Sequence, residues 1–108
     1  MRMFALLLVV AACAGDSTLE REMATMRAHD QHVWNPTSEP AMEAARDVFD
    51  RIDFAGKTGA EVSDMIGAPY KVDGDVWTYM FHDGEQGVVR KLHFAGPRVG
   101  RVEVVLTQ

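Results

Sequence analysis

The sequence predicts an α+β domain in which two helices pack on one face of a three-stranded antiparallel meander. Apolar residues recur at helical spacing between residues 40 and 66. After Pro69, apolar and polar residues alternate in short segments separated by Gly-containing turns, which is typical of antiparallel strands. The chain has 108 residues, of which 47% are hydrophobic and 25% are charged, so it can form one globular domain with a modest core.

The first predicted helix covers roughly residues 40–52, and the second is a short helix that ends at Ile66. The first has one apolar stripe, formed by Met42, Ala45, Val48, Phe49 and Ile52. Thr58 and Glu61 have the spacing of a capping box, which predicts where the second helix begins. Gly67 is predicted to cap its C-terminus, and Pro69 prevents it from continuing.

Three strands are predicted at 75–82, 88–94 and 101–106, and residues 70–72 can add a short extended piece. A loop of residues 83–86 pairs Phe81 with Val88 and Trp77 with Leu92, which brings the large apolar side chains to one face. The helices are expected to cover this face, and the opposite face is expected to be wet because it carries Lys91, among other polar residues.

Arg90 falls on the predicted apolar face, between Tyr79 and Val104. A guanidinium in this position must either reach the edge of the sheet or pair with a carboxylate, for which Glu61 and Asp64 are the candidates. Trp77, Tyr79 and Arg90 are the predicted partner-binding residues.

The N-terminal segment predicts export and lipidation. Residues 1–12 carry one Arg and a run of about ten apolar residues, which is too short to span a bilayer and is typical of a signal peptide. Val10-Ala11-Ala12-Cys13 resembles the lipobox of bacterial lipoproteins, which implies that Cys13 becomes the lipidated first residue of the mature chain. The alternative is a plain signal peptide with an incidental Cys, although Cys13 is the only Cys in the chain.

Residues 13–39 are predicted to link the lipidated Cys13 to a domain at 40–108. Leu19, Met23 and Met26 share one face if this segment is helical. A helix near 18–32 and a mobile tether both remain open at this point.

The tripeptide Gly56-Lys57-Thr58 invites a nucleotide-binding interpretation, which the neighbouring residues oppose. A phosphate-binding loop requires Gly at position 51, where this chain has Arg51, and it must follow a strand rather than a helix. No nucleotide is therefore expected. A net charge of −5 without any basic run also argues against nucleic acid as a partner.

No catalytic set and no metal site is predicted. His29, Asp30 and His32 have a spacing that could bring two imidazoles to one helical face, but two ligands are a weak metal signal. The serines lie outside any nucleophile pattern, and nothing pairs the carboxylates in a pocket. We therefore expect a protein that is not an enzyme and that has no cofactor apart from the covalent lipid on Cys13.

Residues 52–106 resemble the SmpA/OmlA (BamE-like) family of outer-membrane lipoproteins. The resemblance depends on the apolar residue Ile52 and on the signature segment that follows it. The members of this segment are Gly56, Thr58, Glu61, Val62, Gly67 and Pro69. It implies the two-helix, three-strand fold, which is shared with the β-lactamase inhibitor protein. It also implies a non-catalytic binding or scaffolding subunit in the assembly of outer-membrane β-barrels. By the same resemblance, the chain is anchored in the bacterial outer membrane and faces the periplasm, with other envelope proteins as its partners. The alternative function is an envelope inhibitor or sensor that uses the same fold to bind a different protein.

Overall fold

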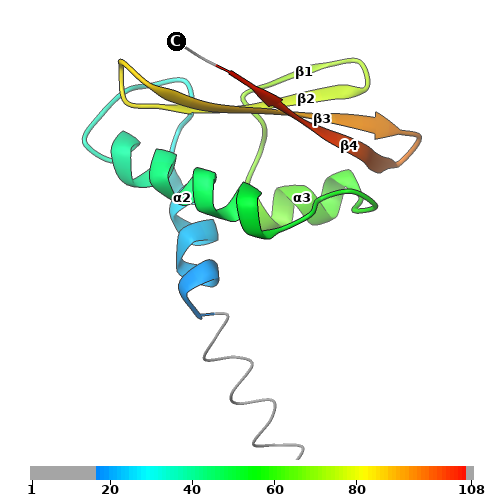
Figure 1. Cartoon of the computed structure of the whole chain (residues 1–108), viewed down its shortest axis with the longest axis horizontal. Helices are drawn as coiled ribbons and strands as arrows, with labels where there is room; N and C mark the ends of the chain where they lie inside the picture. The colour runs from blue at the N-terminus through cyan, green and yellow to red at the C-terminus, as the bar shows by residue number, and fades with distance from the viewer. Residues whose placement is uncertain (1–16, 107–108) are drawn as a thin grey trace, which may run out of the picture.

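A computed structural model describes residues 17–106, and Figure 1 shows their arrangement in two layers. A four-stranded antiparallel sheet forms one layer, and the helices lie on one side of it. The predicted α+β class is confirmed, but the predicted counts were wrong: the described residues form three helices and four strands. The predicted signal peptide and Cys13 lie outside the described residues.

The long helix α2 (Ser38–Arg51) supplies much of the core. Most of its apolar stripe faces the sheet and is buried, with Ala45 and Val48 fully inaccessible to solvent, whereas Phe49 and Ile52 are only partly buried. α2 packs against the two central strands of the sheet, β2 (Val76–His82) and β3 (Gly87–Ala95).

The short helix α3 (Gly59–Ile66) begins with the predicted capping box. The backbone N–H of Glu61 donates to Thr58 Oγ1 over 3.2 Å, and the backbone N–H of Thr58 donates to Glu61 Oε1 over 2.8 Å. The hydrogen bond from the Thr58 backbone lowers the pKa of the Glu61 carboxyl below its usual value. Both orphan donors at the start of α3 are thereby satisfied.

Replacing Thr58 with Ala is expected to lower the free energy of unfolding by about 1 kcal/mol, because one N-terminal donor of α3 loses its acceptor. Urea unfolding followed by circular dichroism measures this change. Thr58→Ser keeps the hydroxyl and is the matched control. Equal losses in the two variants would show that the cap itself contributes nothing.

The strand order is β1-β2-β3-β4, with β1 (Lys71–Asp73) and β4 (Arg98–Val105) at the edges. The predicted register is confirmed: Phe81 lies opposite Val88, and Arg90 lies between Tyr79 and Val104. The short piece expected near residues 70–72 is the fourth strand, β1. The face away from the helices is polar but is not exposed to solvent throughout, since Thr78 is buried there with 5% of its surface exposed.

Residues 17–28 are helical, so the structure contains the helix rather than the mobile tether that the sequence left open. This N-terminal helix lies on the helical side of the sheet, below α2 in the view of Figure 1. Met23 and Met26 are buried in the core, with 6% and 1% of their surfaces exposed. The guanidinium of Arg27 also donates to the carbonyl of Met65 over 2.7 Å, so the N-terminal helix is joined directly to α3.

Candidate protein-binding surface

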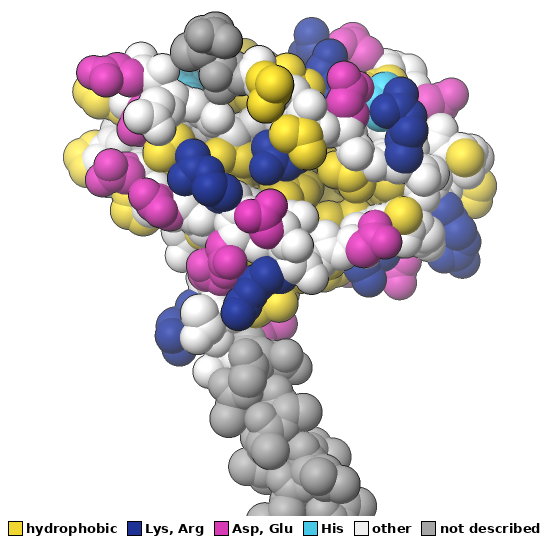
Figure 2. All heavy atoms as spheres, in the orientation of Figure 1, with side chains coloured by type: hydrophobic (Ala, Val, Ile, Leu, Met, Phe, Trp, Pro, Cys, Tyr) yellow, Lys and Arg dark blue, Asp and Glu magenta, His cyan; other side chains and the backbone are white. Residues whose placement is uncertain are grey.

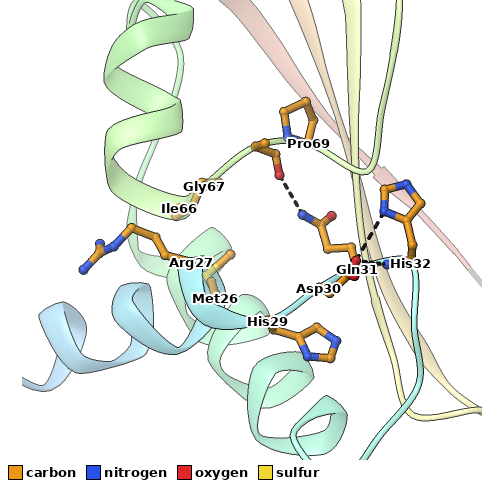
Figure 3. Close-up of a pocket in the computed structure, with 10 residues that line it drawn as sticks. Met26, Arg27, His29, Asp30, Gln31, His32, Ile66, Gly67 and Pro69 are labelled. Carbon is orange, nitrogen blue, oxygen red and sulfur yellow. Dashed lines mark hydrogen bonds and ion pairs between the residues drawn. The ribbon is translucent and has the colours of Figure 1, made fainter.

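A small cavity of about 180 Å³ lies where the N-terminal helix meets the end of α3 (Figure 3). Gln31 joins the two sides of this junction through both ends of its side-chain amide. Its Nε2 donates to the carbonyl of Ala68 over 2.7 Å, and its Oε1 accepts from the backbone N–H of Met80 over 2.9 Å. Gln31 is itself buried, with 6% of its surface exposed. The amide of this side chain therefore connects three segments of the chain.

The histidines at the cavity also have structural partners. His29 is buried, its Nδ1 lies 2.9 Å from Thr37 Oγ1, and burial lowers its pKa. His32 lies 3.4 Å from the carboxylate of Asp30, and its Nε2 is 2.9 Å from the carbonyl of Tyr70. Within residues 17–106, no group of three or more His, Cys, Asp or Glu side chains could hold a metal ion. The cavity is best interpreted as a structural junction whose polar groups hold segments together.

Gly67 explains why the signature segment matters to this junction. Its φ is +88°, and a Cβ at this position would lie 3.3 Å from the Cα of Arg27. Only glycine combines this backbone conformation with so close an approach of the N-terminal helix. Pro69, two residues after Gly67, lines the same cavity.

Tyr79 supports the same junction and is not available to a partner, so its prediction as a partner-binding residue was wrong. Its side chain is fully buried, and its hydroxyl donates to the carbonyl of Gly67 over 2.6 Å. Burial raises the pKa of the Tyr79 phenol well above its usual value. The alternation of β2 predicted the correct face for this residue, but it could not show how completely the helices cover that face.

The other signature residues also have structural roles. Val62 of α3 is fully buried. Gly56, with φ at +89°, donates from its N–H to the carbonyl of Val99 over 2.7 Å and accepts from the guanidinium of Arg98 over 2.8 Å. The signature segment therefore secures α3 to the start of β4.

Trp77 is partly buried at the opposite end of the sheet from the β2–β3 turn. Its ring lies 4.9 Å from the ring of Phe94, measured between centroids, and a Cβ on Gly59 would lie 3.0 Å from the indole. Trp77 thus contacts the first residue of α3, and only part of its surface remains accessible.

Arg90 reaches outward from the apolar face instead of pairing with α3. Its Nη1 donates to the carbonyl of Val89 over 3.1 Å, and its guanidinium lies 5.8 Å from the centroid of the Phe49 ring. The proposed pair with Glu61 was wrong, because that carboxylate accepts from Thr58 instead. Asp64 also makes no ion pair with Arg90 in the described part of the chain. Burial lowers the pKa of the Arg90 guanidinium.

An apolar surface borders Arg90 and lies between β4 and the helices, where Figure 2 shows hydrophobic side chains gathered. We call it the β4 patch and define it by five side chains: Phe49, Ile52, Phe94, Val102 and Val104. α2 packs on β2 and β3 and leaves β4 largely uncovered. Val104 is 58% exposed, and Leu106, which follows β4, is 88% exposed. The sequence placed these residues on the helix-covered face but could not show that the helices stop short of β4.

None of the helices in the described part of the chain is long and apolar enough to cross a membrane. Comparisons with family models, with curated proteins and with solved structures give no match to this chain.

Proposed function

We propose that this chain is an outer-membrane lipoprotein of the SmpA/OmlA type, anchored through Cys13 and facing the periplasm. In this proposal it is a non-catalytic binding or scaffolding subunit in the assembly of β-barrel proteins. The observation that supports binding most strongly is the β4 patch, where Val104 of the edge strand is 58% exposed. Apolar patches that remain accessible on a protein surface are typical of sites that bind other proteins.

The polar side chains inside the fold support the same interpretation. Thr58 and Glu61 cap a helix, and Gln31, His29 and Tyr79 hold the helices against the sheet. These side chains are engaged in internal hydrogen bonds, which favours a structural role for them over acid–base chemistry. Function is then expected at the surface of β4 that the helices leave uncovered.

Replacing Cys13 with Ala is expected to abolish lipidation and to release the chain from the membrane, because several acyl chains hold a protein far more firmly than one. Incorporation of radiolabelled palmitate and fractionation of the envelope measure the two effects. Cys13→Ser is a second variant that also lacks the thiol. Continued acyl incorporation in either variant would contradict the proposed anchor.

The identity of the partner distinguishes the proposed function from its alternative. In detergent-solubilised membranes, affinity purification of the full chain is expected to recover subunits that insert β-barrels, and Val104→Asp is expected to reduce their recovery. Val72→Asp is the matched control, since Val72 is 54% exposed on the opposite edge strand, β1. Recovery of a hydrolase instead would favour an envelope inhibitor, and recovery of neither would contradict the scaffolding role.

A further inference from the structure

The two sides of the sheet differ in how many of their backbone N–H and C=O groups are already paired. At the β1 edge the strand has only three residues, and Gln31 Oε1 accepts the N–H of Met80, where a longer β1 would have paired. Short edge strands and side chains that bind the free backbone are devices that prevent further strands from adding. The β1 side of β2 is therefore paired over most of its length, and β1 itself offers only three residues to a further strand.

The β4 edge is closed only at its beginning. The N–H of Gly56 donates to the carbonyl of Val99 over 2.7 Å, and the N–H of Val99 donates to the carbonyl of Lys57 over 2.9 Å. From Gly100 to the end of β4, no other strand of the described residues lies on this edge. Six consecutive residues, 100–105, thus border an open edge.

The pairing pattern identifies which backbone groups are free. The N–H of Phe94 bonds on the β2 side of β3, so by alternation Lys91 turns its backbone groups toward β4 and pairs there with Glu103. The neighbours of Glu103 in β4, Val102 and Val104, then turn their N–H and C=O groups to the open edge. Their side chains belong to the β4 patch, so one added strand would bond these backbone groups and cover these side chains together.

Charge indicates the chemistry of the strand that would fit. Residues 87–105 contain four basic residues and one acidic residue, Glu103, which gives a local net charge of +3 in a chain whose net charge is −5. The basic residues are Arg90, Lys91, Arg98 and Arg101. Among the described residues no carboxylate forms an ion pair with Arg90, which lies beside the β4 patch. An acidic segment complements this hairpin, whereas a second copy would bring two basic strands together.

We propose that β4 accepts an acidic, extended segment of another protein as a fifth strand, with apolar side chains against the β4 patch and a carboxylate beside Arg90. This proposal rests on the proposed binding function and specifies its mode, strand addition at an open sheet edge. Main-chain hydrogen bonds along β4 supply affinity in this mode, and the β4 patch and Arg90 supply specificity.

A defined peptide tests strand addition. The probe is the acetylated and amidated octapeptide Thr-Val-Thr-Asp-Thr-Val-Thr-Val, added to the isotopically labelled full chain in detergent micelles. Hydrogen exchange followed by nuclear magnetic resonance is expected to slow at least tenfold at the amides of Val102 and Val104, because each would become bonded to the peptide. A peptide N-methylated at alternate residues keeps the side chains and is expected to bind at least tenfold more weakly.

Variants of the chain separate backbone pairing from charge. Val104→Pro removes one free N–H of the β4 edge, and Val72→Pro does the same at the β1 edge; only the first is expected to weaken binding. Arg90→Glu is expected to weaken binding of the peptide about tenfold. A second peptide, in which Lys replaces the Asp, is expected to bind the Arg90→Glu variant as tightly as the first peptide binds the unchanged chain. Thermal unfolding confirms that each variant is folded.

Three outcomes would overturn the proposal. The first is protection of amides at β1 or elsewhere but not at β4, and the second is equal binding of the N-methylated peptide. The third is protection of Val102 and Val104 that rises with the concentration of the chain without any peptide, which would identify a second copy as the occupant. None of these outcomes depends on acylation of Cys13 or on the proteins recovered from membranes, so the proposed function is tested separately.

Discussion

Replacing Gly67 with Val is expected to lower the free energy of unfolding by about 3 kcal/mol or more. A non-glycine residue at its φ of +88° costs about 1–3 kcal/mol. A Cβ would also lie 3.3 Å from the Cα of Arg27, so the N-terminal helix would have to move, and overpacking of this kind costs about 1–3 kcal/mol. Urea unfolding of the full chain measures the sum.

Gly74 offers a matched control for this prediction. Its φ is +57°, and a Cβ there would meet nothing within 4 Å, so Gly74→Val carries conformational strain without a clash. The loss at Gly67 is expected to exceed the loss at Gly74 by about 1 kcal/mol or more. Equal losses would show that the N-terminal helix does not approach Gly67 as closely as the structure places it.

Replacing Met26 with Ala is expected to lower the free energy of unfolding by about 2–5 kcal/mol, the range for removing a large apolar side chain from a core. Met26 has 1% of its surface exposed although it precedes the domain boundary that the sequence predicted at residue 40. Its loss would leave a cavity among Met23, Ile66 and their neighbours in the core. The measurement is again urea unfolding.

Arg21→Ala, on the exposed side of the same helix, is the control and is expected to change the free energy of unfolding by no more than about 0.5 kcal/mol. If Met26→Ala were as mild as this control, residues 17–28 would be an independent segment and not part of the core.

The local features of this fold could be predicted because they depend on residues close together in the sequence. The capping box of Thr58 and Glu61 needs only the correct spacing, and it is present. The pairing of Phe81 with Val88 followed from the alternation of two strands joined by a short loop, since a shift of one residue would have turned every apolar side chain to the wrong face.

The features that depend on how elements meet could not be predicted. The stripe of Met23 and Met26 was visible, but a stripe alone cannot show which surface covers it, so the docking of the N-terminal helix stayed open. Gln31 carried no signal at all, because a single amide in a loop belongs to no pattern. The position of α2 over β2 and β3 depends on packing between layers, and it is this position that leaves Val104 uncovered.

The most direct test of the central claim, that a lipid-anchored chain binds another envelope protein through β4, is photo-crosslinking in living cells. A photoreactive amino acid replaces Val104 in one strain and Val72 in another, since these side chains are similarly exposed on opposite edges of the sheet. The account predicts an adduct with a subunit of the β-barrel assembly machinery from position 104, a much weaker one from position 72, and loss of the adduct when Cys13 is replaced by Ala. Equal adducts from both positions, or an adduct that persists without Cys13, would contradict it.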